Sequence, residues 1–229
     1  MTCFHTDQPI EGTEDSPDLL GREVYAARIG KALLLPKNSA GIVVSIEGEW
    51  GYGKTSFLNL ITRHYLSLPV GERPIVVNFS PWMVSGVENL AQEFLVQLAS
   101  SIGISDNAKQ AQNAARQVLS YSKVFTALKF IPGAEPWASI VQEAMECVGG
   151  AAESIGKLKE LSIDDKRDKV VKALTGLNKA IVIFIDDIDR LPPKEVFDIV
   201  RLVKAVADFP RVSFVLAYDL NKTGVRPYN

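Results

Sequence analysis

A glycine-rich segment between an apolar run and a helical pattern constrains the fold of this chain more than any other feature. The segment reads Gly48, Glu49, Trp50, Gly51, Tyr52, Gly53, Lys54 and Thr55, and it fits the pattern G-x-x-x-x-G-K-[ST]. It directly follows the apolar residues Ile42 to Glu47 and opens the periodic segment Ser56 to Tyr65. Strand, loop and helix in this order are the context in which the pattern binds phosphate groups. We therefore predict a phosphate-binding loop at Gly48 to Thr55, called the phosphate loop below.

Each residue type in the phosphate loop has a chemical reason. Its glycines permit backbone conformations in which successive N–H groups turn inward around phosphates, and the following helix N-terminus adds partial positive charge. Lys54 supplies a mobile charge that can bridge the β- and γ-phosphates, which gives it a catalytic role, and the Thr55 hydroxyl can coordinate Mg²⁺. We predict that every residue of the loop, together with the adjacent Ser56, binds nucleotide.

Four short apolar runs have the composition of buried strands. They are rich in Val, Ile and Phe, lack a strict alternation with polar residues, and are separated by helical patterns; they span Ile42 to Glu47, Ile75 to Phe79, Ile181 to Ile185 and Val212 to Ala217. Such runs are typical of a parallel sheet covered on both faces. We predict an α/β fold with a mostly parallel sheet of at least four strands, flanked by helices.

Two carboxylates, Asp186 and Asp187, end the third apolar run. Ligands of an open parallel sheet bind at the carboxyl ends of its strands, so both residues should face the phosphates. We predict that Asp186 helps Thr55 to hold Mg²⁺ through a water molecule, and that Asp187 is catalytic and orients or activates the attacking water. Taken alone, the pair could be ordinary strand-end residues, but its position downstream of the phosphate loop favours the functional role.

The remaining segments define the domain organisation. The polar residues 1–17 predict a flexible N-terminal arm, and residues 18–229 predict one nucleotide-binding domain. A helical insertion is expected at about 103–162, between the second and third strands. Between the second and third strands, helix starts are indicated by two capping patterns, Ser85 with Glu88 and Ser162 with Asp165.

A further helix is predicted after the third strand. Pro192 and Pro193 can start it. Its apolar face toward the sheet should consist of Val196, Ile199, Val200, Val203 and Val206.

Three places in the chain resemble the KAP family of P-loop NTPases. Gly48 to Thr55 matches the family's phosphate loop, and Asp186 to Arg190, which reads Asp-Asp-Ile-Asp-Arg, is similar to its Asp-Asp-x-Asp-Arg signature. Phe79 to Trp82 resembles the family's Phe-Asn-x-Trp, with Ser80 in place of Asn. The resemblance extends from about Asp18 to Asp219 and implies a P-loop NTPase fold that binds ATP and Mg²⁺ and hydrolyses ATP.

Two shorter matches leave alternatives open. Leu20 to Glu23 is similar to a segment that covers the base in related ATPases, and Ala217 to Asp219 ends the fourth strand where a sensor residue would lie. Each is equally compatible with a plain helix entry or strand end. Arg190 could reach the nucleotide of a neighbouring subunit as an arginine finger, although an ion pair with Asp187 or Asp189 is favoured.

The resemblance also implies elements beyond the fourth strand. Related domains have a fifth strand beside the phosphate-loop strand, followed by a helical lid, and residues 220–229 are too few for either. We therefore expect the C-terminal strand and lid to be missing and turnover to be weak. The first strand would then be an exposed apolar edge, open to a protein partner or to a second copy of the chain in a homo-oligomer.

The composition of the chain limits the partners and the cellular location that we expect. Lys and Arg number 25 against 27 Asp and Glu, and the net charge of -2 gives no general reason to bind nucleic acid. The two cysteines suggest neither a disulfide framework nor a metal cluster. No run of about 18 apolar residues predicts an integral membrane segment. We expect a cytoplasmic protein whose contact with a membrane, where there is one, is peripheral.

Three functions fit these observations to different degrees. An ATP-driven switch, whose helical insertion reports the nucleotide state to a partner, is favoured. A nucleotide-binding scaffold or interaction module with little or no turnover is the alternative. A phosphotransferase fits least, because the Asp-Asp-Ile-Asp-Arg run suits water activation and no arginine-rich lid for a second substrate is visible.

Overall fold

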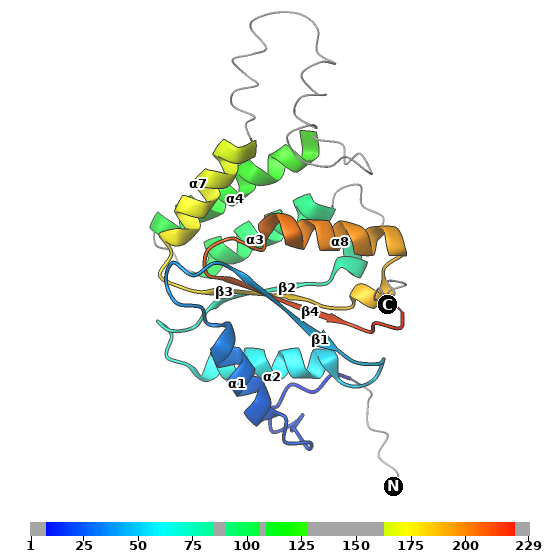
Figure 1. Ribbon diagram of the computed structural model, residues 1–229. Helices are drawn as coiled ribbons and strands as arrows, with labels where there is room; N and C mark the ends of the chain where they lie inside the picture. Colours follow the sequence, from blue (N-terminus) through cyan, green and yellow to red (C-terminus); the bar gives the residue numbers. More distant parts are fainter. Residues whose placement is uncertain (1–7, 85–89, 106–108, 128–162, 223–229) are drawn as a thin grey trace, which may run out of the picture.

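The computed structural model describes residues 8–84, 90–105, 109–127 and 163–222 (Figure 1). In chain order the elements are α1 (Glu23–Leu33), β1 (Ile42–Glu47), α2 (Lys54–Ser67), β2 (Ile75–Phe79), the 3₁₀ turn η1 (Pro81–Val84), α3 (Leu90–Ser105), α4 (Lys109–Ala127), α7 (Ile163–Thr175), β3 (Ile181–Ile185), the 3₁₀ turn η2 (Ile188–Arg190), α8 (Pro193–Val206) and β4 (Val212–Tyr218). Helices cover both faces of a central sheet, which confirms the predicted α/β class.

The sheet has four parallel strands in the order β1-β4-β3-β2. All four predicted strands are present, and only β4 differs, because it extends one residue beyond its predicted end, to Tyr218. The register brings the carboxyl ends of β1, β3 and β4 to one edge, where Glu47 pairs with Tyr218 and Ile185 with Leu216. This is the edge at which the sequence places the phosphate loop and the acidic pair.

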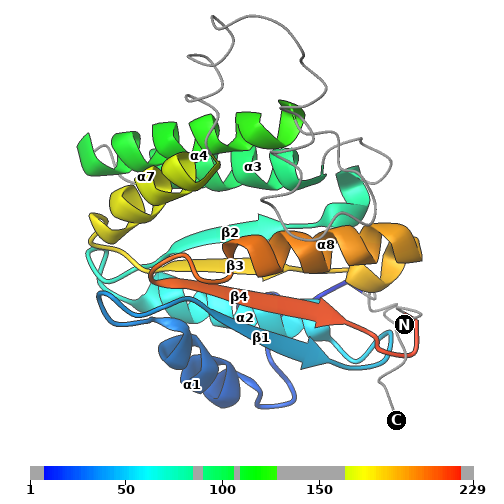
Figure 2. The ribbon, with the colours of Figure 1, turned by 45° about the horizontal axis from the view of Figure 1, so that its top comes forward.

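The continuous apolar run of β3 is explained by burial on both faces. Val182 and Phe184 belong to a core formed with α1 and α2. Ile181, Ile183 and Ile185 belong to a second core on the other face, formed with α3, α4, α7 and α8. Figure 2 shows α1 and α2 on one side of the sheet and α3 and α8 on the other.

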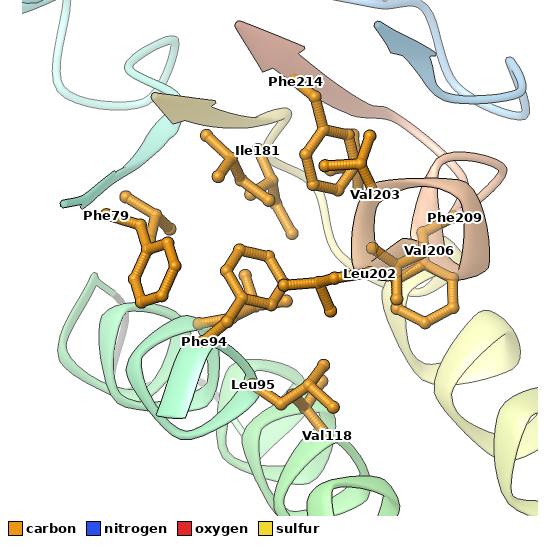
Figure 3. Close-up of a cluster of buried hydrophobic side chains, with 14 of the residues drawn as sticks. Phe79, Phe94, Leu95, Val118, Ile181, Leu202, Val203, Val206, Phe209 and Phe214 are labelled. Carbon is orange, nitrogen blue, oxygen red and sulfur yellow. The ribbon is translucent and has the colours of Figure 1, made fainter. Parts of the chain in front are cut away.

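The second core centres on aromatic side chains (Figure 3). The ring of Phe94 on α3 lies 5.4 Å from that of Phe79 at the end of β2 and 6.2 Å from that of Phe214 on β4, measured between centroids. Val118 joins this core from α4, which packs on α3. Of the predicted insertion at 103–162, the structure describes the end of α3 and all of α4, whereas residues 106–108 and 128–162 lie outside the described residues.

Helix α8 begins at Pro193 as predicted, but its predicted apolar face was wrong at one position. Val200 is 52% exposed, and Leu202 is buried in its place. At about 100° per residue, Val200 and Leu202 lie on opposite margins of the face formed by the other four predicted residues, so the helical spacing alone does not decide which of the two is buried. The capping residues Ser85, Glu88 and Ser162 lie outside the described residues.

Part of the predicted N-terminal arm contacts helix α2. The backbone N–H of Ile10 donates to Ser56 Oγ at 3.1 Å, and Asn59 Nδ2 donates to the Ile10 carbonyl at 3.1 Å. Gly12 has a φ of 71° and lies so close to Leu60 that a Cβ would approach the leucine side chain to 2.7 Å. Residues 10–12 therefore have a packing role that the prediction of a flexible arm did not include.

The described sheet ends at β1 on one side. Among the described strands, β1 pairs with β4 alone, so it forms an edge of the described sheet, and Val43 on it is 44% exposed. The idea that a partner or a second copy covers this edge stays a prediction. Within the part of the chain that the structure describes, no helix has the length and apolar character needed to cross a membrane.

Candidate nucleotide-binding site

The phosphate loop is anchored at both ends by regular structure. The N–H of Gly48 donates to the Tyr218 carbonyl at 3.2 Å, which extends the pairing of β1 with β4 into the loop. The loop then turns through a hydrogen bond from the Tyr52 N–H to the Glu49 carbonyl at 3.2 Å. Gly51 and Gly53 have φ values of 85° and 76°, a region that side chains disfavour. The glycines are therefore needed by this backbone path.

Helix α2 presents an uncapped N-terminus to the loop. Its N-cap is Gly53, no side chain caps it, and its first turn contains no acidic residue. The backbone N–H groups of the first turn lack partners within the helix, so they can bind an anion. Lys54 Nζ lies at the same place, where it donates to the carbonyls of Gly48 at 2.8 Å and Glu49 at 3.2 Å. An ammonium group and helix N–H groups thus converge on the loop.

Thr55 and Asp186 meet although 131 residues separate them in the sequence. Thr55 Oγ1 donates to Asp186 Oδ2 at 2.7 Å. The Asp186 N–H donates to the Phe79 carbonyl at 3.2 Å, which fixes the carboxylate relative to β2. Burial raises the pKa of Asp186 above its ordinary value, against the opposing effect of hydrogen bonds from Thr55 and the Asp187 N–H. A hydroxyl and a carboxylate oxygen are hard ligands suited to Mg²⁺, so these two residues fit the metal ion that the sequence predicts here.

Asp187 directly follows Asp186 in the chain and has a left-handed backbone conformation, with φ 60° and ψ 33°. Its N–H donates to Asp186 Oδ1 at 2.8 Å, and its Oδ1 accepts a hydrogen bond from Arg190 Nε at 2.8 Å. The sequence left two roles open for Arg190, an arginine finger and an ion pair. The structure contains the favoured one, an ion pair with Asp187. The two predicted carboxylates are therefore adjacent but differently held, Asp186 by the loop threonine and Asp187 by an arginine.

Three other residues predicted to bind nucleotide differ in exposure. Trp50 and Tyr52 are 63% and 69% exposed, so their side chains point away from the protein interior, and the ammonium of Lys222 lies 5.6 Å from the centroid of the Trp50 ring. Ser56 is buried, and its hydroxyl accepts the Ile10 N–H. Any role of these three residues in phosphate binding would therefore come from their backbone.

Sequence reasoning did not find all residues that touch the loop. Arg22, the N-cap of α1, places Nη1 3.5 Å from the carbonyls of Tyr52 and Gly53, and a Cβ on Gly53 would lie 2.5 Å from that nitrogen. Asp219, considered as a sensor or a strand end, is buried and accepts the Asn221 N–H at 3.0 Å in the turn after β4. The short Leu20 to Glu23 match was the only sequence signal for Arg22.

We expect Asp186→Asn to raise the free energy of unfolding at neutral pH. The pKa of Asp186 in the folded state lies above the ordinary value of 3.8, so the free energy of unfolding falls as pH rises from the unfolded pKa through the folded pKa. Asn does not titrate, so the advantage of the variant should be present at about pH 7 and shrink toward about pH 4. Urea unfolding across this range measures it, with the exposed Asp168→Asn as control. Equal stability of variant and wild type at neutral pH would contradict the expectation.

A parallel sheet, a glycine-rich loop before a helix, and a loop threonine bonded to an acidic strand end define a P-loop NTPase domain. The chain belongs to the KAP family, because the model of the KAP family P-loop domain matches residues 22–223. It is 33% identical over 223 residues to the phage T7 exclusion protein of Escherichia coli (strain K12). The match covers 90% of this chain and 30% of that protein. The chain thus spans less than a third of the length of this relative.

Proposed function

We propose that this domain binds Mg-ATP at the phosphate loop, hydrolyses it slowly, and uses the two nucleotide states as a switch. The observation that carries the proposal is the 2.7 Å hydrogen bond between Thr55 Oγ1 and Asp186 Oδ2. It brings a loop hydroxyl and a strand-end carboxylate together at the N-terminus of α2. Membership of the KAP family supports nucleotide binding at this place.

Each group of the loop has a part in holding the nucleotide. The backbone N–H groups of the loop and of the first turn of α2 would donate to the phosphate oxygens. Lys54 Nζ would exchange its present acceptors, the carbonyls of Gly48 and Glu49, for oxygens of the β- and γ-phosphates. Thr55 and Asp186 would hold Mg²⁺, Asp186 through a water molecule. When bound, the ion neutralises charge on the phosphate oxygens.

We assign to Asp187 the role of acting on the attacking water. Its Oδ1 is engaged by Arg190, and no described residue donates to its Oδ2. Oδ2 can therefore orient a water molecule and accept a proton as the water oxygen bonds to the γ-phosphorus. The bond from the γ-phosphorus to the bridging oxygen breaks, and ADP leaves with that electron pair. The products are ADP and inorganic phosphate.

The helical layer can carry the nucleotide state to a partner. Asp186 is hydrogen-bonded to the end of β2 through the Phe79 carbonyl, and Gln97 on α3 donates to the Asn78 carbonyl of the same strand at 2.6 Å. Phe79 also packs on Phe94 of α3. A shift at Asp186 would therefore reach α3, and α4 through it. We place the partner surface on this layer for that reason.

A domain that holds nucleotide without turnover is the alternative function. The ion pair between Arg190 and Asp187 is compatible with this alternative as well as with hydrolysis, because it occupies one oxygen of the predicted catalytic carboxylate and leaves the other oxygen available. The two functions share the nucleotide site and differ only in hydrolysis.

Phosphate release from ATP by the purified chain distinguishes the two functions. We expect slow, Mg²⁺-dependent release of inorganic phosphate that stops when EDTA removes the metal. Mg²⁺-dependent ATP binding without measurable phosphate release would instead establish the scaffold. Transfer of phosphate to an added acceptor would contradict both.

A further inference from the structure

The two turns that follow β2 and β3 lie side by side at the nucleotide edge of the sheet. Strands β2 and β3 pair in parallel up to Phe79 and Ile185, and the Asp186 N–H then donates to the Phe79 carbonyl. Turn η1 follows β2 and turn η2 follows β3, and the two turns contact each other. Two segments that lie about a hundred residues apart in the sequence, and that carry separate parts of the family resemblance, are thus neighbours in space.

Arg190 on η2 joins these turns through two simultaneous contacts. Its Cζ lies 5.3 Å from the centroid of the Trp82 ring on η1, and its Nε donates to Asp187 Oδ1 at 2.8 Å. A guanidinium group is planar, so it can lie over an aromatic ring and hydrogen-bond in its own plane at the same time. A lysine ammonium lacks this combination. The pair of contacts therefore depends on arginine and not on positive charge alone.

The contacts of Asp187 fix one carboxylate oxygen and leave the other available. Its backbone is tied by the N–H bond to Asp186 Oδ1 and by a bond from the Arg190 N–H to its carbonyl at 3.1 Å. The backbone ties set the position of Cα, and Arg190 Nε then selects the rotation of the carboxylate. Oδ2 accepts no hydrogen bond from any described residue. The orientation of Oδ2 thus follows from the position of the Arg190 guanidinium.

We propose that Arg190 is a positioning residue for Asp187 within its own chain, and that Trp82 is the platform that holds Arg190 in place. The role deepens the proposed function and rests on it, since it presumes that Asp187 acts on the attacking water. It differs from an arginine finger, which would have to leave Asp187 to reach the nucleotide of a neighbouring subunit. The chemistry of the phosphate loop gives no role to Trp82 on η1 or to Arg190 on η2. In this proposal the two residues share one role, which is to orient the Asp187 carboxylate.

Steady-state hydrolysis by variants tests the positioning role. Arg190→Gln and Arg190→Lys should lower kcat about 10- to 100-fold, the usual effect of losing a hydrogen bond to a charged group, with KM for ATP little changed. Trp82→Leu should lower kcat about 2- to 5-fold, and Trp82→Phe, which keeps a ring, should lower it less. Arg201→Gln is the matched control, because Arg201 also pairs with an aspartate three residues before it at similar exposure, 46% against 48% for Arg190. The control should retain wild-type kcat.

Two further measurements separate this role from the alternatives. If Arg190 acts on a neighbouring subunit, mixing Arg190→Gln with Lys54→Ala restores turnover, because the second variant supplies the arginine. Positioning within the chain predicts no restoration.

In the ¹⁵N–¹H NMR spectrum of the wild type without nucleotide, the Arg190 Nε–H should be protected from exchange and shifted by the Trp82 ring. Both the protection from exchange and the shift of the Arg190 Nε–H signal should be lost in Asp187→Ala.

The failure of the positioning role is distinguishable from the failure of the proposed function. Normal wild-type hydrolysis with unchanged kcat in Arg190→Gln overturns the positioning role alone. Restored turnover in the mixture replaces it with an arginine finger. Absence of a protected Arg190 Nε–H signal overturns the pairing itself. Absence of phosphate release from the folded wild type overturns the hydrolysis, and the positioning role falls with it.

Discussion

The Asp187→Asn variant should bind Mg-ATP as tightly as the wild type and release phosphate roughly 100- to 10,000-fold more slowly, the range expected for loss of a general base. Asn has nearly the same shape as Asp, tolerates the left-handed backbone conformation of this position, and can still accept the hydrogen bond from Arg190. It cannot take a proton from water. The substitution therefore removes the proposed chemistry while it preserves the local geometry. Single-turnover phosphate release, together with a binding titration, measures both effects.

Asp198→Asn provides the control for Asp187→Asn. Asp198 also precedes its arginine partner, Arg201, by three residues, and it lies on helix α8, which covers the face of the sheet opposite α2. This variant should release phosphate at the wild-type rate. Wild-type turnover in Asp187→Asn would contradict the role of Asp187, and a matching loss of affinity would indicate instead that Asp187 helps to hold the nucleotide.

The Lys54→Ala variant should bind Mg-ATP about 10- to 150-fold more weakly than the wild type, the range that corresponds to one hydrogen bond to a charged group. Lys54 Nζ already lies against the carbonyls of Gly48 and Glu49 at the opening of the loop, so it can reach phosphate oxygens with a small rotation of its side chain. Anisotropy of a fluorescent ATP analogue, displaced by unlabelled ATP, measures the affinity.

Lys204→Ala serves as the control for this substitution, because Lys204 is an exposed residue in the last turn of α8. It removes the same charge from the chain and should leave the affinity unchanged. Equal affinity of Lys54→Ala and the wild type would show that nucleotide, if bound, is bound elsewhere.

The strands could be predicted from the sequence because strands buried on both faces consist of apolar residues. β3 consists of Ile, Val, Ile, Phe and Ile, and every one of these side chains is buried, on alternate faces of the sheet. A run without polar positions has no exposed face, which a parallel sheet between two helical layers requires. The phosphate loop was predictable for a related reason, since its glycines are demanded by local backbone conformation.

Contacts between distant side chains could not be predicted in the same way. The contact of Trp82 with Arg190 depends on which strands are neighbours, and the sequence patterns do not contain the order β1-β4-β3-β2. Arg22 reaches the phosphate loop because α1 packs on α2, a contact without a local signal. Val200 was misplaced because a helical pattern gives the centre of an apolar face more accurately than its margin.

A calorimetric titration of the purified chain with ATP, in the presence and in the absence of Mg²⁺, tests directly whether the domain binds Mg-ATP. We predict binding at one site per chain that is strengthened by Mg²⁺, because Thr55 and Asp186 offer oxygen ligands for the ion beside the phosphate loop. A folded wild-type chain that binds no ATP under either condition would contradict it.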